Sequence, residues 1–542
     1  MNYIAESRAF RDFSVTSSTT DLFSQTAAVV TATRNSIAVY RTAEGLHYPV
    51  VVEDIADALS RMETDERLHG LLPPIYPEWL GDRGFTETHG ARFAYVVGEM
   101  ARGISSASMV IAAVRAGFVG FFGSAGLGLP AIAEALSEIT NAIGAESPAW
   151  GANLIHDPNQ PDLEHAIVKL FLERGVKRVS ASAFMRLSPD VVHYSAAGLA
   201  RDAQGRLVRN THIFAKISRT EVAAPFMTPA PPDMLRALVE ARRITAEQAE
   251  MASLVPVAED LTVEGDSGGH TDGRPITALF PVIANLRDEL AARFAYTRPI
   301  RLGWAGGIGT PSAVAGAFQH GAAYVVIGSV NQSAMESGVS AGARAMLAEA
   351  DVTDVIMAPA SDMFELGVKV QVLKRGTMFA VKGQKLYELY RRYDSLDSLP
   401  EKERNWLERQ VLRNSVDAAW ANCRDYLVKA KSAQLEQADR DPKRRMALVF
   451  RSYLFFGGQW ARDGVEDRRI DYQIWCGPAM GAFNDWVRGT VLEPLENRTV
   501  ATIGLNLLEG ASSVTRAHQL RAAGVHVPAE FFSFPPKQLN LE

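Results

Sequence analysis

The chain has 542 residues, 47% of them hydrophobic and 22% charged, with a formal net charge of −6 at pH 7. This composition is ordinary for a globular protein with one large core and one or two further domains, and nothing in it suggests a nucleic-acid or membrane partner. Cys423 and Cys476 form no metal or redox motif, the first residues lack a signal-peptide pattern, and no apolar run could span a bilayer. We therefore expect a cytoplasmic protein.

The first part of the chain, residues 1–89, is predicted to be an appendage without catalytic residues. Residues 1–35 are rich in Ser and Thr, which indicates a loose arm. The elements expected after the arm are a hairpin of Ile37–Tyr40 with Tyr48–Val52 around Glu44-Gly45, a helix over Ile55–Met62, and a proline-locked crossing at residues 71–77 that marks a boundary.

From Phe93 onward, apolar strands alternate with amphipathic helices. Eight strands are expected, at Tyr95–Gly98, Val119–Phe122, Trp150–Ile155, Arg178–Phe184, Ile213–Ile217, Leu261–Val263, Ile300–Trp304 and Ala323–Ile327. Eight strand–helix units over about 240 residues are what an α/β protein with a (β/α)₈ TIM barrel needs, so residues 90–378 are predicted to form that barrel. A doubly wound open sheet is the alternative. Residues 379–542 are helix-rich and charged, and we expect a C-terminal helical domain there.

Two glycine loops follow the last two predicted strands. Gly306-Gly307 precedes a helix that Thr310 caps, and Gly328-Ser329 follows the next strand. Such loops let backbone N–H groups approach a phosphate beside a helix N-terminus. Glycines alone could simply make tight turns, but their recurrence after two neighbouring strands favours a phosphate-bearing cofactor. The dinucleotide-binding fingerprint of an early βαβ unit is not present.

Catalytic residues of a barrel lie at the C-terminal ends of its strands. The sequence places there Met100, Ala101, Gly123, Asn153, Ser182, Lys216, His270 and the two glycine loops. We find no His/Asp/Glu trio at metal-ligand spacing, and no nucleophile elbow or His-Glu-x-x-His motif, so a metal is not expected. This set predicts a flat phosphorylated cofactor with one titratable group above it.

Three polar residues are candidates for direct roles. His270 can exchange a proton near neutral pH, and Gly268 and Gly269 before it leave room for a ring system, although a lone histidine is often structural. Lys216 ends an apolar strand, where an inward lysine needs an anion or ring acceptor; reaching solvent is the alternative. Asn153 could bind a heteroaromatic ring edge or cap a loop.

Longer motifs carry a family resemblance. The strand-end Gly-Gly-His and the two phosphate loops resemble the superfamily of FMN-dependent nitronate monooxygenases and flavin enoyl-ACP reductases. The motifs GEMARGISS, FFGSAGLGLPAIAEAL, GDSGGHTDGRP, IGSVNQSAMESGVS, APASDMFELGVKVQVLKRGTMF, KLYELYRRYDSLD and DYQIWCGPAMGAFNDWV are similar to the PfaD-type proteins. These are trans-acting enoyl reductases of polyunsaturated fatty acid synthases and trans-acyltransferase polyketide synthases. The resemblance covers about residues 35–510.

The resemblance implies FMN as cofactor, NADPH or NADH as hydride donor, and an enoyl thioester on an acyl carrier protein as substrate. It implies that His270 and Lys216 are the catalytic residues. His270 would give the proton or orient the thioester carbonyl, and Lys216 would contact the polar edge of the flavin ring. The implied cofactor-binding residues are Gly98, Met100, Ala101, Gly103, Asn153, Lys216, Gly268, Gly269, Gly306, Gly307, Gly328, Ser329 and Gln332. A flavin oxygenase of the nitronate monooxygenase kind is the alternative, and a non-catalytic FMN-binding assembly partner is a further one.

Three residues depart from the family pattern, in which small residues stand at the positions of Glu99, Arg102 and Ser361. The expected carrier-protein partner is acidic, so basic segments are candidate contacts, at Lys369–Arg375 and Lys382–Arg392. The chain could form a homodimer. The aromatic segment Tyr472–Trp486 is interpreted as packing between domains, with a binding face as the alternative.

Overall fold

The structure is a computed structural model that describes residues 26–63, 66–144, 146–156, 161–429 and 434–539. It contains two compact units. One is formed by Met1–Pro77 with Leu508–Phe534, and the other by Glu78–Leu507 with Pro535–Glu542. We describe each unit by itself.

None of the helices in the described ranges is both long and apolar enough to cross a membrane.

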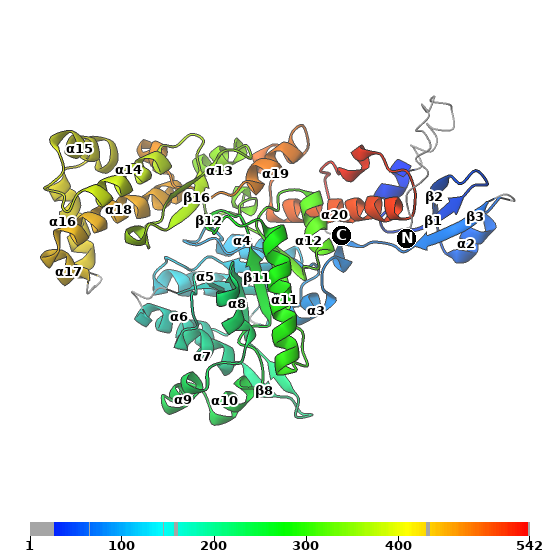
Figure 1. Cartoon of the computed structure of the whole chain (residues 1–542), viewed down its shortest axis with the longest axis horizontal. Coiled ribbons are helices and arrows are strands. Elements are labelled where there is room, and N and C mark those ends of the chain that lie inside the picture. Colours follow the sequence, from blue (N-terminus) through cyan, green and yellow to red (C-terminus); the bar gives the residue numbers. More distant parts are fainter. Residues whose placement is uncertain (1–25, 64–65, 145, 157–160, 430–433, 540–542) are drawn as a thin grey trace, which may run out of the picture. The chain divides into compact units, whose positions relative to one another are not determined.

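The larger unit contains a closed parallel barrel of eight strands (Figure 1). Its strands are β4 (Tyr95–Val97), β5 (Val119–Phe122), β6 (Trp150–Ile155), β7 (Arg178–Ser182), β10 (His212–Ile217), β11 (Asp260–Glu264), β13 (Arg301–Ala305) and β14 (Tyr324–Ile327). β14 pairs with β4, for example Val326 with Val96, and this closes the barrel. The predicted TIM barrel is confirmed, and the open sheet is wrong. The strands are near-continuous buried apolar runs, as expected when both faces of a parallel sheet are covered.

Helices between the strands cover the outside of the barrel. They are α4 (Ala107–Arg115), α5 (Leu129–Ile143), α6 (Pro161–Glu173), α7 (Pro189–Ala197), α8 (Thr220–Met227), α11 (Ile276–Phe294) and α12 (Pro311–Gln319). Two further helices, α9 (Pro232–Glu240) and α10 (Ala246–Ala252), and the hairpin of β8 (Leu199–Arg201) and β9 (Leu207–Arg209) extend the α7–α8 region. The Thr310 side chain accepts a hydrogen bond from the Ala313 N–H, so the predicted cap of α12 is confirmed.

The N-terminal end of the barrel is closed by α3 (Arg83–His89), after the short turn at Pro77–Trp79. Phe85 of this helix stacks on Tyr324 with ring centroids 4.5 Å apart, and both side chains are fully buried. Residues 78–89 were expected in the N-terminal appendage. They group with the barrel instead, because the apolar side of α3 fills the base of the barrel.

A helical region and a small sheet follow the barrel. β15 (Val355–Pro359) and β12 (Gly269–His270) both pair antiparallel with β16 (Lys369–Leu373). The helices are α13 (Ala341–Ala348), α14 (Phe379–Arg392), α15 (Glu401–Trp406), the π-helical turn Leu407–Leu412, α16 (Val416–Lys429), α17 (Gln434–Arg440), α18 (Pro442–Asp463) and α19 (Ala479–Val487).

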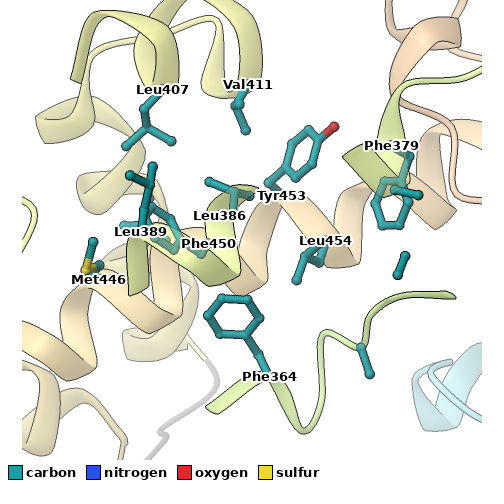
Figure 2. Packing of buried hydrophobic residues seen from close by; sticks show 14 of the residues in the cluster. Phe364, Phe379, Leu386, Leu389, Leu407, Val411, Met446, Phe450, Tyr453 and Leu454 are labelled. Atoms are coloured by element: carbon teal, nitrogen blue, oxygen red, sulfur yellow. The ribbon is translucent and has the colours of Figure 1, made fainter. Parts of the chain in front are cut away.

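The helical region has its own apolar core. α14 and α18 pack against each other (Figure 1), and Leu386, Phe450 and Leu454 meet between them. Figure 2 shows that Phe364, from the turn between β15 and β16, enters the same core; its ring lies edge-on to Phe450 at 6.3 Å. This core therefore fixes the β15–β16 turn as well as the helices.

The smaller unit is a three-stranded antiparallel sheet with the second part of α20 (Val500–Ala522). The predicted hairpin is confirmed as β1 (Ser36–Arg41) and β2 (His47–Val52), and the predicted helix as α2 (Ile55–Ser60). Sequence reasoning missed the third strand, β3 (Arg67–Leu72), because the adjacent prolines suggested only a crossing. Of the predicted loose arm, residues 26–31 are helical, and residues 1–25 lie outside the described part.

The C-terminal boundary also differs from the sequence expectation, in which residues 379–542 form one helical domain. Leu520 and Val525 are buried in one cluster with Ile37 and Val39 of β1, so this part of the chain groups with the N-terminal strands. Arg516 donates hydrogen bonds to the carbonyls of three residues that are distant in sequence: Thr33, Asn35 and Pro73.

Candidate active site

The two glycine loops lie at the C-terminal ends of the neighbouring strands β13 and β14. Gly306 and Gly307 have φ angles of 93° and 72°, a left-handed backbone that other residues rarely adopt. A Cβ atom built on Gly307 or on Gly328 would meet no atom within 4 Å, so the space in front of both loops is open. Directly after the second loop, Gln332 holds a buried Nε2 that has no hydrogen-bond partner among the described residues. An open glycine cradle with an unused amide donor fits a phosphate group.

The segment before α19 packs directly on these loops. The N–H of Gly477 donates a 3.0 Å hydrogen bond to Oγ of Ser329, and a side chain on Gly309 would overlap the backbone at Ala479. The N-terminus of α19 therefore begins beside the two glycine loops, which is the place of the short extra helix in many TIM barrels. A Cβ on Gly268 would lie 2.9 Å from the Cys476 nitrogen, so close packing already explains the first glycine of the Gly-Gly-His motif.

The loop after β4 reaches the same end of the barrel. A Cβ on Gly98 would lie 3.3 Å from Cα of Gly328, so the loops after the first and last strands touch. Ala101–Ile104 form a turn in which Arg102 and Gly103 have φ angles of 60° and 71°. A left-handed arginine costs of order 1–3 kcal/mol, and such strain is typical of functional loops.

Lys216 lies in a buried ion-pair cluster. Its Nζ is 2.9 Å from Oε1 of Glu264 and 3.2 Å from Oε1 of Glu99, and only 3% of the Glu99 side chain is exposed. Burial by itself would lower the pKa of Lys216, but the two carboxylates raise it above its usual value. The sequence predicted an anion or a ring acceptor for an inward lysine, and the anions are the protein's own. Lys216 therefore keeps its proton at neutral pH.

Asn153 is held by its neighbours on β7. Its Nδ2 donates to the carbonyl of Ser180 and to Oγ of Ser182, both at 3.1 Å. Both donor hydrogens are therefore used within the barrel, and only the side-chain oxygen is left for a ligand.

His270 is placed differently from the sequence expectation. The barrel strand β11 ends at Glu264, and His270 lies beyond it on β12, paired with Val370 of β16. Its Nε2 is 3.1 Å from Oδ2 of Asp362. Burial would raise the pKa of Asp362, but the hydrogen bond and charge of His270 lower it overall. A carboxylate in this position holds the imidazole ring in one orientation.

Sequence reasoning missed Asp362, although the motif that contains it carried the resemblance. The residue is held from the helical region: Nε of Arg451 on α18 donates a 2.7 Å hydrogen bond to the carbonyl of Ser361, and Phe364 enters the helical core (Figure 2). A carboxylate in a Ser-Asp-Met-Phe turn gives no local signal of a histidine 92 residues away.

The structure also assembles a His/Asp trio that sequence reasoning did not predict. His89, His212 and Asp260 are buried at the base of the barrel, with ligand atoms within 4.8 Å of one another. Nδ1 of His89 accepts a hydrogen bond from Arg178, and Asp260 accepts one from Arg301. Two arginines beside the trio would repel a cation, so these residues do not fit a metal ion.

Comparison with solved structures identifies the family. The enoyl reductase domain of MlnA, from the macrolactin biosynthesis cluster of Bacillus amyloliquefaciens, has 37% sequence identity and a TM-score of 0.78, over 82% of this chain and 99% of that one. This chain belongs to the PfaD-type enoyl reductase family.

Two curated relatives of this PfaD-type chain are longer proteins. A polyunsaturated fatty acid synthase subunit of Thraustochytrium sp. is 45% identical over 449 residues, which are 82% of this chain and 30% of that protein. Polyketide biosynthesis protein PksE of Bacillus subtilis is 42% identical over 434 residues, which are 80% of this chain and 56% of that protein. The chain thus spans about a third to a half of these relatives.

One further likeness concerns the helical region. The family model described as "[Acyl-carrier-protein] S-malonyltransferase, inserted helical domain" matches residues 393–472. This stretch contains α15 to α18 and ends at the residue before the strip Gln473–Trp475.

Proposed function

We propose that the protein is an FMN-dependent enoyl reductase that acts in trans on enoyl thioesters of an acyl carrier protein in polyketide or fatty acid synthesis. NADPH or NADH is the hydride donor. The observation that supports this best is a barrel of the enoyl reductase family with two open glycine loops at its strand ends and the His270–Asp362 pair beyond strand β11. When bound, FMN would supply the hydride transfer to the β-carbon of the enoyl group.

The residues at the strand ends suit a phosphate ester. Backbone N–H groups of Gly306, Gly307, Gly328 and Ser329 would bind the phosphate, and the unpartnered Nε2 of Gln332 is a further donor. The N-termini of α12 and α19 add favourable helix dipoles beside it. Gly98, Met100, Ala101 and Gly103 would border the ring system.

His270 would serve the thioester. Reduction leaves enolate charge on the thioester oxygen and requires a proton at the α-carbon. The imidazole can donate a hydrogen bond to the oxygen or the proton to the carbon, while Asp362 holds the ring in place. Lys216 stays protonated between Glu99 and Glu264, so it would not supply the proton, and the two carboxylates offset its positive charge.

A single preparation tests this function. The purified protein should be yellow from non-covalent FMN, NADPH should bleach it without oxygen, and an enoyl thioester should restore the colour. Oxygen uptake on nitroalkanes without enoyl reduction would show a flavin oxygenase instead. A flavin that NADPH does not bleach would favour the non-catalytic assembly partner.

The partner proposal rests on exposed basic residues. Lys374 is exposed at the end of β16, and Arg391 and Arg392 are exposed at the end of α14. Arg375 is exposed as well but pairs with Asp354. In the predicted contact segment Lys382–Arg392, Lys382 is ion-paired with Asp471 and is not available to bind a carrier protein. The homodimer and the cytoplasmic location stay predictions.

A further inference from the structure

The strip that follows the helical region runs along β16. The N–H of Leu373 donates to the carbonyl of Ile474 at 2.8 Å, and Trp475 forms a bridge with Val372. In extended chain, alternate residues face the same side, so Gln473 and Trp475 share one face. Each carries a buried polar atom without a partner in the described ranges, Oε1 of Gln473 and Nε1 of Trp475. Buried polar groups are normally hydrogen-bonded, so this face lacks its partner.

One end of this face lies at the proposed proton donor. Gly269, directly before His270, has a φ angle of 85°, and a Cβ built on it would lie 3.8 Å from Cδ2 of Trp475. The indole ring therefore lies against the backbone that presents His270.

The other end carries an arginine. The Arg102 guanidinium carbon is 5.7 Å from the centre of the Trp475 ring and 4.4 Å from that of Phe455. A Cβ on Gly458 would lie 2.5 Å from Nη1 of Arg102 and 3.2 Å from Oε1 of Gln473, so both side chains lie against Gly458.

Arg102 has no counter-ion in the described part of the chain. Its Nη1 donates to the carbonyl of Phe455 at 2.8 Å, and the carboxylate of Asp362, which acts on Arg102 by its charge, is not within ion-pair distance of it. The neighbouring charge is Arg462, whose Nη1 donates to the Arg102 carbonyl at 3.3 Å. Burial and this like charge lower the pKa of Arg102 to about 10, although Asp362 acts in the opposite direction. A guanidinium in these surroundings favours a bound anion.

We propose that Trp475, Gln473 and Arg102 bind the phosphopantetheine arm that carries the acyl group. The arm is a chain with amides that ends in a phosphate. The indole N–H matches an amide carbonyl, the Gln473 oxygen matches an amide N–H, and the Arg102 fork matches the phosphate. The order of these groups from His270 outward places the thioester at His270 and the phosphate at Arg102. This inference rests on the proposed function and adds that a strip outside the barrel selects the substrate.

The test compares one enoyl chain attached to pantetheine with the same chain attached to phosphopantetheine. We expect the ratio of kcat/KM for the phosphorylated over the unphosphorylated thioester to fall about 10- to 100-fold in Arg102→Gln, as for loss of a charge-assisted hydrogen bond. Arg102→Lys should recover part of the ratio. Arg424→Gln, an exposed arginine on α16, is the matched control and should leave the ratio unchanged.

A binding measurement makes the test independent of turnover. Calorimetry with phosphopantetheine itself on the flavin-loaded protein should show binding that Arg102→Gln weakens by at least about 10-fold and that Trp475→Phe weakens about 2- to 10-fold. Trp475→Phe keeps an aromatic ring at this position and removes the N–H together with one ring of the indole.

Two results would overturn the inference. If Arg102→Gln raises KM for NADPH but leaves the thioester ratio unchanged, the guanidinium binds a dinucleotide phosphate. If Arg102→Gln changes neither the KM for NADPH nor the thioester ratio, and this variant still binds phosphopantetheine, then Arg102 only links the barrel loop to α18. If the wild type reduces no thioester at all, the proposed function fails, and calorimetry still decides whether this strip binds the arm.

Discussion

The His270 side chain is paired with Asp362, a residue from a different part of the chain. We predict that His270→Ala keeps flavin and its reduction by NADPH, yet slows reoxidation by an enoyl thioester by roughly 10²–10⁴-fold, the usual range for general acid help. His270→Gln should recover part of the loss if a hydrogen bond dominates, and none if proton transfer does. Stopped-flow measurement of the two half-reactions separates these cases. Wild-type rates in both half-reactions of the alanine variant would make His270 structural.

Gly328 has open space where a side chain would stand. We predict that Gly328→Asp folds but loses FMN, because a carboxylate would repel the phosphate at this loop. Gly307→Asp should do the same, with added backbone strain from the φ angle of 72°. Gly316→Ala, on α12 and also open, is the control and should retain flavin. The measurement is the flavin content per protein, read from absorbance after gel filtration. Full retention of flavin by both aspartate variants would contradict the proposed phosphate site.

The buried histidines at the barrel base should make stability depend on pH. Burial lowers the pKa of His89 to about 4 and that of His212 well below its usual value, while Asp260 only partly opposes this. The unfolded chain binds these protons near pH 6.5, so the stability they contribute is complete above that pH and is lost as the pH falls toward 4.

We therefore predict that the unfolding midpoint of the wild type falls between pH 6.5 and 4.5, and that it falls less steeply in His212→Phe. Phenylalanine fills a similar volume and cannot take up a proton. Thermal unfolding at a series of pH values measures both slopes. Equal slopes in the two proteins would mean that His212 is not one of the groups responsible.

At the scale of elements, the helical core positions a residue of the active site. Phe364 is fully buried between α14 and α18 and lies two residues after Asp362 (Figure 2). We predict that Phe364→Ala costs about 3–5 kcal/mol through the cavity it leaves, and that it also slows enoyl reduction because the Asp362 turn loosens. Leu407→Ala empties the same core from the π-helical turn Leu407–Leu412, and Figure 2 shows Leu407 on the other side of the core from Phe364. It should cost similar stability with a smaller loss of rate, and equal losses in both variants would contradict this link.

At the scale of the whole molecule, the two compact units should respond separately to mutation. Arg516 is fully buried and donates hydrogen bonds to three backbone carbonyls of the smaller unit. We predict that Arg516→Ala destabilises that unit by at least about 2 kcal/mol, since each buried carbonyl left unsatisfied costs about 1–3 kcal/mol. Hydrogen exchange should rise in β1 and β2 and stay unchanged in the barrel strands. Arg488 is exposed, and Arg488→Ala should change neither the stability of the smaller unit nor its hydrogen exchange.

The sequence by itself determined the elements whose signals are local. All eight barrel strands, the hairpin of β1 and β2, the Thr310 cap and the two glycine loops could be predicted, because apolar periodicity, turn residues and capping residues act within a few positions of the chain. The order of these elements then sufficed for the barrel, since parallel strands joined by helices have few ways to close.

Only the tertiary structure decided which charges meet. Glu99, Lys216 and Glu264 come together from three strand ends, His270 meets Asp362 across 92 residues, and Arg102 reaches the strip of Trp475 from the first barrel loop. Each of these side chains is ordinary among its sequence neighbours. Its protonation and its partners depend on burial and on charges within a few ångströms, which are properties of the folded chain and have no period or spacing in the sequence.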